Sequence, residues 1–437
     1  MLRSIMILMM IIGTVPMIFV KPHVGMLVWS WISYMNPHRL SYGFAYDMPM
    51  LDAIAAATLV GWLISREPKR FRLHPVSLTL ILFWGWTLVT TILSKAPDRS
   101  WPELTVVSKI MFFTLMLLPL ITTKWRLHSL IYVIILSLGF FGIKGGLFTV
   151  ITGGNYIVNG PAGTFIGDNN HLALALLMLI PLLRYVSLHG DTPWIRHAAL
   201  WSIFIVAISI LGSQSRGAFV AALVTMPILV AKGRRRIAIF ALLGVMALGG
   251  LAFMPQEWRD RMATITTYEQ DASATGRLDM WRGAFRLAQD HPFVGGGFSS
   301  NYHPPFMAQY MEPGKELRAY HSIYFMTLGE HGFVGLLLFL MIMTASYFTC
   351  AHIVKLARGD PDLKWAEDLA KMLQISLIAY GVAGAFLSLA KFDLFYHLCA
   401  MTLILHRVVA ARLDAKAPAP ALAAPRPMPA AMPRPAE

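Results

Sequence analysis

Residues 75–94 read PVSLTLILFWGWTLVTTILS, a run without a single charged side chain. The hydrocarbon core of a bilayer is about 30 Å thick, so a helix needs about 20 apolar residues to cross it. On its N-terminal side the run is bounded by Arg66-Glu67-Pro68-Lys69-Arg70-Phe71-Arg72, a stretch with too much charge for the apolar core. This part of the sequence therefore predicts a membrane-spanning helix that begins just after a basic loop.

The same pattern recurs along the whole chain. Of its 437 residues, 56% are hydrophobic and 14% are charged, and the mean hydropathy is +0.58, whereas soluble domains carry about 25% charged residues. A lone apolar run could be a buried core helix, but a series of them predicts an all-α, polytopic membrane protein of about 12 transmembrane helices. The first two runs are short and separated by Lys21-Pro22, so they form two crossings, or one crossing plus an interfacial piece. The other runs beside 75–94 are 5–20, 24–36, 50–65, 104–123, 128–150, 170–188, 197–212, 217–231, 237–254, 321–349, 372–390 and 394–410.

Basic side chains assign the loops to sides of the membrane. Lys and Arg accumulate in cytoplasmic loops, and here every second loop is basic, beginning with 66–74. We therefore expect both termini in the cytoplasm. The other basic loops carry Lys124 and Arg126, Arg184 and Arg196, Lys232 and Arg234 to Arg236, then Lys355, Arg358, Lys364 and Lys371, and finally Arg407. The outer loops are 95–103, 151–169, 213–216, 255–320 and 391–393.

Charge and cysteine usage exclude several classes of protein. The formal net charge is +14, but the positive residues lie in short loops between apolar runs, so no nucleic-acid partner is expected. Cys350 and Cys399 lie in or beside apolar runs, which argues against a disulfide framework or a cysteine metal site. Residues 1–20 resemble a signal peptide without a small-residue cleavage site, so we expect a retained membrane anchor.

The pattern divides the chain into four regions. Residues 1–254 hold the first nine or ten transmembrane helices, 255–320 form one large loop on the outer side, and 321–410 hold the C-terminal transmembrane helices. Residues 411–437, rich in Ala, Pro and Met, form a disordered cytoplasmic tail. Long structured loops are often functional, and apolar residues of 255–320 fall near helical spacing, so we expect this loop to be partly helical.

Within the large loop lies the run Gly295-Gly296-Gly297. It lacks the Gly-Lys-Ser/Thr ending of a nucleotide P-loop and the strand–helix context of a dinucleotide site. We therefore favour a tight turn that lets two backbones approach closely, rather than a phosphate cradle.

Three positively chargeable residues lie at the outer membrane boundary. Arg216 lies between two spans, Arg277 in the large loop, and His321 at the start of the span 321–349. A guanidinium can hold phosphate oxygens in paired charge-assisted bonds, and a histidine can act as a general base near neutral pH. Together the three suggest a lipid-linked phosphate or pyrophosphate substrate. Taken singly, each arginine could instead contact lipid headgroups, and His321 could be an ordinary interfacial histidine.

Neighbouring residues are candidates for binding the substrate. Arg318 and Tyr320 directly precede His321 in the sequence. Asn170 follows Asp168 at the start of another span; helix capping is favoured for Asp168, and a substrate or a structural role is open for Asn170.

Lys391 is a further candidate, because a charge at or near bilayer depth is costly and is therefore often functional. A structural ion pair between Lys391 and Asp393 explains it equally well. The outer loops contain no Asp-x-Asp, His-Glu-x-x-His or other metal-ligand cluster, so no metal site is expected.

A series of short motifs follows in the second half of the chain. They are Ser215-Arg216-Gly217, Gly276-Arg277 with Trp281, His291-Pro292 with Gly295 and Gly297, His321-Ser322, and Leu328-Gly329-Glu330-His331-Gly332-Phe333-Val334-Gly335. Their order resembles that of the O-antigen ligase and polymerase superfamily, over roughly residues 165–350 and more weakly over the N-terminal half. Asn36-Pro37-His38 and Asp168-Asn169-Asn170 are similar to a branch described as O-glycosylation ligases.

This resemblance implies a metal-independent, inverting glycosyltransferase of the GT-C type, without a cofactor, at the periplasmic face of the bacterial inner membrane. Its donor would be a glycan on undecaprenyl pyrophosphate and its acceptor the lipid A–core oligosaccharide, a step of lipopolysaccharide biosynthesis. The family's arginines carry over onto Arg216 and Arg277, and its histidine onto His321, as general base or phosphate ligand. Ser322 departs from the asparagine that often follows the family histidine, which puts an amide role at that position in doubt.

Other functions stay open. A polymerase that joins two lipid-linked units, or a ligase that glycosylates a secreted protein, would use the same donor. A transporter of lipid-linked sugars is less favoured, because the sequence shows no internal repeat and no matching pair of broken helices.

Overall fold

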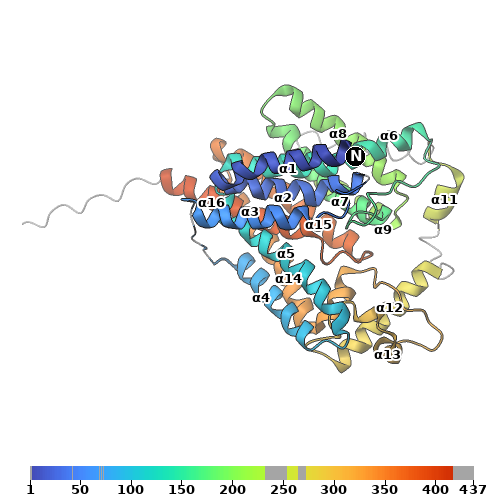
Figure 1. The fold of residues 1–437 in the computed structure, drawn as a ribbon. Coiled ribbons are helices and arrows are strands. Elements are labelled where there is room, and N and C mark those ends of the chain that lie inside the picture. The colour runs from blue at the N-terminus through green and yellow to red at the C-terminus, as the bar shows by residue number, and fades with distance from the viewer. Residues whose placement is uncertain are drawn as a thin grey trace, which may run out of the picture.

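The computed structural model describes residues 2–41, 43–67, 69, 71, 73–231, 253–263 and 272–416. The regular structure of these residues is helical, and no strand occurs among them. Eight of the helices are long and apolar enough to cross a membrane, so the protein is an all-α polytopic membrane protein (Figure 1). The eight are α1 (Leu2–Val20), α4 (Pro75–Ile92), α5 (Pro97–Leu120), α6 (Lys124–Ile151), α7 (Asn169–His189), α8 (Pro193–Gly212), α14 (Ile323–Ala357) and α16 (Asp393–Lys416).

Further helices occupy the other expected apolar runs. They are shorter or, in one case, begin with a charged turn, so a total of about twelve crossings stays a prediction. The expected span 237–254 lies almost entirely outside the described residues, as does the expected tail 411–437 beyond Lys416. Residues 411–416 continue α16, so the expectation of disorder is wrong for them. These helices are α2 (Pro22–Met35), α3 (Met50–Ile64), α9 (Arg216–Ala231) and α15 (Lys364–Gly384).

The bundle of helices has two ends, which we name by the loops that they carry. At one end, Arg126 donates to both carboxylate oxygens of Glu67 at 2.6 and 3.0 Å, and Lys416 pairs with Asp360 at 2.8 Å. We call this the basic end; it carries 121–123, 190–192, 358–363 and the described part of 65–74. The opposite end, which we call the loop end, carries 93–96, 152–168, 213–215, 291–322, 385–392 and the described part of 36–49.

The first two helices form a hairpin. Lys21 alone separates them, and Pro22, which has no N–H to continue the hydrogen bonding of α1, opens α2. Near the turn of this hairpin, a Cβ at Gly61 of α3 would stand 2.7 Å from the Ile18 carbonyl oxygen, so α3 packs closely against the end of α1. Figure 1 shows α1, α2 and α3 side by side.

This hairpin corrects one expectation. Ser4, in the first turn of α1, lies close to Gly43 at the loop end, with 3.9 Å between the Ser4 hydroxyl and a Cβ position at Gly43. The last turn of α16 lies at the basic end, where Lys416 pairs with Asp360. The first turn of α1 and the last turn of α16 are therefore at opposite ends of the bundle, and the expectation that both chain ends share a side is wrong for these turns.

The large loop is partly helical, as expected. It contains α11 (Gln256–Ala263), α12 (Ala272–Asp290) and the short α13 (Pro304–Met307). The Trp281 ring of α12 stacks on Phe325 of α14 with ring centres 4.9 Å apart. Figure 1 shows α12 and α13 together at the end of α4, α5 and α14.

Helix α14 is broken where the large loop meets it. Gly332 has φ +68° and ψ −171°, which are not helical angles. The break leaves carbonyls free, and the glycine run fills the gap: Gly296 N–H donates to the Gly329 oxygen and Gly297 N–H to the Glu330 oxygen, both at 2.9 Å. A Cβ at Gly295 would stand 2.6 Å from the Gly329 oxygen. The prediction of a close backbone approach is confirmed.

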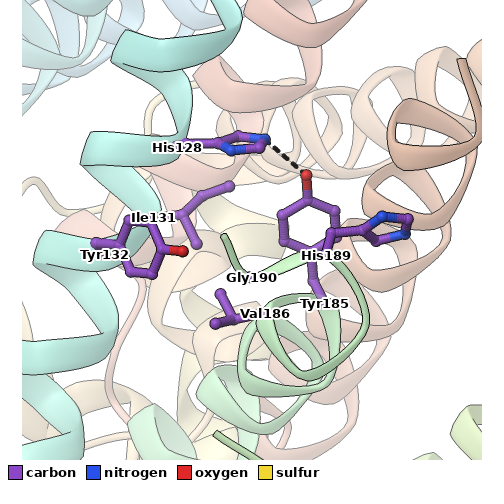
Figure 2. Close-up of a pocket in the computed structure, with 7 residues that line it drawn as sticks. All are labelled: His128, Ile131, Tyr132, Tyr185, Val186, His189 and Gly190. Carbon is purple, nitrogen blue, oxygen red and sulfur yellow. Dashed lines mark hydrogen bonds between the residues drawn. The ribbon is translucent and has the colours of Figure 1, made fainter. Parts of the chain in front are cut away.

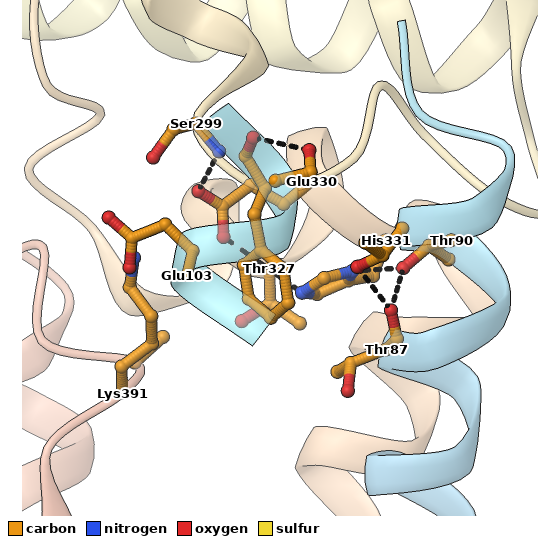
Figure 3. Close-up of polar contacts among 12 residues, drawn as sticks. Thr87, Thr90, Glu103, Ser299, Thr327, Glu330, His331 and Lys391 are labelled. Carbon is orange, nitrogen blue, oxygen red and sulfur yellow. Dashed lines mark hydrogen bonds and ion pairs between the residues drawn. The ribbon is translucent and has the colours of Figure 1, made fainter. Parts of the chain in front are cut away.

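Side chains also link the large loop to α14 and α4 at this break (Figure 3). One carboxylate oxygen of the buried Glu330 accepts the Ser299 N–H at 2.9 Å. The neighbouring His331 is also buried, and its Nδ1 lies 2.7 Å from the Thr90 hydroxyl of α4. The motif Gly329 to Gly332 is therefore a structural junction that fixes the large loop on α14 and α4.

Candidate functional site

Helices α7, α9 and α14 begin at the loop end, and several of the predicted site residues lie at or near their first turns. Asn169, at the start of α7, donates from its amide to the Ser213 carbonyl just before α9, at 2.7 Å. His321, just before α14, donates from its backbone N–H to the Ser388 hydroxyl at 2.8 Å. The N-termini of α7, α9 and α14 therefore open toward one region, and helix N-termini favour negative charge nearby.

The start of α7 is held by its own acidic residue. Asp168 accepts the N–H of Asn170 at 2.8 Å and of His171 at 3.3 Å, so the predicted capping role is confirmed. The Asn170 side-chain amide also donates to Asp168, at 3.0 Å. These bonds fix the Asn170 side chain and the backbone of the first turn of α7.

His321 lies in an unusual backbone conformation and an electropositive setting. Its φ is +47°, in the left-handed region that few side chains other than Asn, Asp and His adopt. Burial, followed by the positive charge of Arg277 and the nearby His171, lowers the pKa of His321 to about 4, while Asp168 acts in the opposite direction. The imidazole is therefore neutral at pH 7 and able to accept a proton.

The two predicted arginines lie on elements that end at the same region. Arg277 belongs to α12 and acts electrostatically on His321. Arg216 is the first residue of α9, where the Ser215 hydroxyl accepts the Ala218 N–H at 3.3 Å and caps the helix. The structure thus brings Arg277 and His321 into one electrostatic environment and places Arg216 at the same end of the bundle.

Arg318 lies beside Gly276, the residue before Arg277 in α12, and pairs with Glu316. One of its guanidinium nitrogens would stand 3.3 Å from a Cβ at Gly276. The guanidinium donates to Glu316 at 2.6 and 3.1 Å, and both side chains are about half exposed or more. The Arg318 side chain is therefore accessible to solvent at the loop end.

Tyr320 and Lys391 are held in ways that favour a structural role. Tyr320 is 1% exposed, and its carbonyl accepts the Trp281 indole N–H at 2.6 Å. Lys391 pairs with Glu103 of α5 at 2.7 Å and lies over the Phe298 ring (Figure 3).

Asp393 does not take part in that pair. Its carboxylate accepts from Ser33 of α2 and from the Leu394 N–H. The interpretation of Lys391 and Asp393 as an ion pair is therefore wrong, because the chain turns between them and directs the two side chains to different helices.

Two residues of this region were not singled out by sequence reasoning. His171 ends the Asp168 to His171 element, so its place beside a capping aspartate was a usable signal. Ser388 carries no sequence signal, because its contact with His321 joins positions 67 residues apart.

A second polar cluster lies at the other end of α7 (Figure 2). There the Tyr185 hydroxyl lies 2.7 Å from His128 Nε2, and His189 Nε2 lies 3.0 Å from Asp368. Both bonds join neighbouring helices at the basic end, and a small hollow lies between them. This cluster is separated from the loop-end residues by the length of α7 and is not part of the candidate site.

In the part of the chain that the structure describes, no group of three or more His, Cys, Asp or Glu residues is arranged to hold an ion.

The fold and the site together define a polytopic helical membrane protein with Arg216, Arg277 and His321 at its loop end. Residues 201–340, which include Arg216, Arg277 and His321, match the model of the O-antigen ligase family. Residues 2–191 match a family of unknown function (DUF5935). No curated protein matches the chain.

Proposed function

We propose that the protein is an O-antigen ligase, which transfers a glycan from undecaprenyl pyrophosphate to the lipid A–core oligosaccharide. The match of residues 201–340 to the O-antigen ligase family supports a ligase- or polymerase-type role in O-antigen processing. The observation that carries the proposal is the environment of His321, a neutral imidazole under the influence of Arg277 at the end where α7, α9 and α14 begin. A base beside fixed cations suits attack by a hydroxyl on a sugar phosphate.

The chemistry divides between these residues. In an inverting transfer the acceptor oxygen attacks the anomeric carbon while the carbon–oxygen bond to the pyrophosphate breaks. His321 takes the proton of the acceptor hydroxyl, and the bonding electrons leave on the phosphate oxygen. Arg216 and Arg277 stabilise that developing charge, and each preplaced donor of this kind contributes about 3 kcal/mol. The two guanidinium groups take the part that a divalent cation plays in other enzymes, so we propose transfer without a metal.

The orientation in the membrane follows from charge. The basic end would face the cytoplasm and the loop end the periplasm, because Lys and Arg are retained on the cytoplasmic side. The donor's undecaprenyl chain would stay in the bilayer while its pyrophosphate reaches the loop end of the bundle.

Reconstitution in liposomes tests the proposal. Purified protein, undecaprenyl-pyrophosphate-linked glycan and lipid A–core are incubated, and the glycosylated acceptor is measured by gel shift and mass. Loss of a base costs about 10²–10⁴-fold and loss of an oxyanion donor about 10²–10³-fold, which are the reductions expected for His321→Ala and for each arginine variant. The controls His197→Ala and Arg358→Ala alter exposed residues at the basic end and should leave the rate unchanged.

Three outcomes would overturn parts of the proposal. Elongation of the lipid-linked donor without transfer to lipid A–core would identify a polymerase, and transfer only to a protein acceptor would identify a protein ligase. Full activity of His321→Ala would remove this residue from catalysis. Loss of activity with a chelator, restored by added metal, would refute the metal-free mechanism.

A further inference from the structure

We propose that Ser388 is a positioning residue for His321, whose hydroxyl holds the His321 backbone in the conformation that places the imidazole in the site. This inference rests on the proposed function of His321. The bond is direct, with the His321 N–H donating to the Ser388 Oγ at 2.8 Å. Ser388 belongs to the segment 385–392, which links α15 to α16.

The His321 backbone needs external support. An L-residue in the left-handed region costs roughly 1–2 kcal/mol, and such a conformation persists only where the surroundings impose it. With φ +47°, His321 is one of four residues other than glycine with positive φ in the described part of the chain. Removal of the contacts that impose this φ would let the backbone relax and carry the imidazole away.

Those contacts come from three different elements. Tyr320, on one side, has its carbonyl held by Trp281 of α12 at 2.6 Å. Ser322, on the other side, caps α14 with its hydroxyl. Ser388 holds the residue between them, so it supplies the contact that acts on His321 itself.

The segment 385–392 is rigid enough to impose a position. Two buried tyrosines, Tyr380 and Tyr396, donate from their hydroxyls to backbone carbonyls of the segment at 2.9 and 2.7 Å. Near its end, Lys391 pairs with Glu103 of α5 at 2.7 Å. The segment is therefore tied to α5, α15 and α16.

The same segment also touches the helix that carries Arg216. A Cβ at Gly217 would stand 3.1 Å from the Phe386 Cβ, so Phe386 packs against the first turn of α9. Ser388 lies two residues further along. The segment therefore contacts both His321 and the first turn of α9, which begins with Arg216.

The test compares Ser388→Ala with Ser388→Thr, which keeps the hydroxyl. In the transfer assay, Ser388→Ala should lower kcat about 10–100-fold with KM nearly unchanged, since a misplacement of about 1 Å costs on the order of 100-fold. The pH at which kcat of Ser388→Ala falls on the acid side of its pH–rate profile should move from near 4 toward 6.5. The reason is that the imidazole leaves the surroundings that lower its pKa. Ser388→Thr should restore both. Ser202→Ala, in α8, is the control for loss of a serine hydroxyl, and thermal unfolding verifies folding.

Two kinetic results would overturn the inference. If Ser388→Ala has the same kcat as wild type and loses activity in acid at the same pH, the bond does not position His321. A raised KM with unchanged kcat would show that Ser388 contacts the substrate instead.

A readout independent of activity separates this inference from the proposed function. If wild-type protein transfers no glycan, the proposed function fails, but NMR of histidine-labelled protein still reports the His321 titration, assigned by its loss in His321→Gln. A pKa near 4 in the wild type and Ser388→Thr, and near 6.5 in Ser388→Ala, is expected. Equal values in all three proteins would refute the positioning role.

Discussion

Replacing Gly295 with alanine should destabilise the protein more than the same change at Gly314. Both glycines adopt the left-handed region, with φ of +61° and +79°, so both substitutions carry the roughly 1–2 kcal/mol cost of an L-residue there. They differ in the available space. A methyl carbon at Gly295 would stand 2.6 Å from the Gly329 oxygen and 2.8 Å from the Gly332 nitrogen, whereas nothing lies within 4 Å of that position at Gly314.

The additional cost at Gly295 follows from what must move. The obstructing atoms belong to backbone, which cannot rotate away as a side chain can, so the glycine run must shift off α14. That shift weakens the hydrogen bonds from Gly296 to Gly329 and from Gly297 to Glu330. Each such bond contributes about 0.5–1.5 kcal/mol, so Gly295→Ala should cost about 1–3 kcal/mol more than Gly314→Ala.

Thermal unfolding of the two variants in detergent, followed by tryptophan fluorescence, measures this difference. The midpoint of Gly295→Ala should lie about 1–3 °C below that of Gly314→Ala, because an unfolding entropy of about 2.1 cal/mol/K per residue over 437 residues gives roughly 1 °C per kcal/mol. Equal midpoints would refute the reasoning, because they would show that the close approach to the broken helix contributes nothing to stability.

The carboxylate of Glu330, 3% exposed, should tolerate glutamine, which keeps an acceptor for the Ser299 N–H, while Glu330→Ala leaves that group unpaired and lowers stability by about 1–3 kcal/mol in the same unfolding assay. At the basic end, hydrogen bonding to Arg126 lowers the pKa of Glu67 below its ordinary value of 4.5. The folded-state pKa is the lower one, so the stabilisation is complete above about pH 4.5 and is lost as the pH falls through the folded value. The unfolding midpoint of wild type should therefore exceed that of Glu67→Gln at pH 7 and converge with it in acid; a constant gap would contradict this. Because the pKa of His321 is lowered to about 4, the transfer rate should be constant between pH 5.5 and 7.5, a range that begins about one unit or more above that pKa. A fall in the rate centred near pH 6.5 would exclude a base in this environment.

Much of the helical framework could be predicted from the sequence. The uncharged run 75–94 became α4, and each of the other expected runs except 237–254 corresponds to a described helix. Such predictions succeed because a bilayer imposes a local requirement, a sufficient length of apolar residues with internally bonded backbone. The capping role of Asp168 was predictable for the same reason, since a cap depends on neighbouring residues alone.

The candidate site was only partly predictable. The basic residues Arg216, Arg277 and His321 could be proposed from their type and from the side on which their loops lie. The contacts that position these residues could not be predicted, because they join distant parts of the sequence, as the bond between His321 and Ser388 does. Tyr320 was a candidate because it adjoins His321 in the sequence, but its side chain is buried in the core.

The sequence by itself determined that this protein is built of apolar helices, where most of them begin and end, and which loops are basic. Only the tertiary structure decided that Lys391 pairs with Glu103, 288 positions away, and not with Asp393, two positions away. It likewise decided that Gly295 to Gly297 fill the break in α14 and that α1 folds back on α2. The physical reason is the distance in sequence over which each interaction acts. Hydropathy and capping depend on neighbouring residues, whereas ion pairs and close packing depend on which helices come together in the fold.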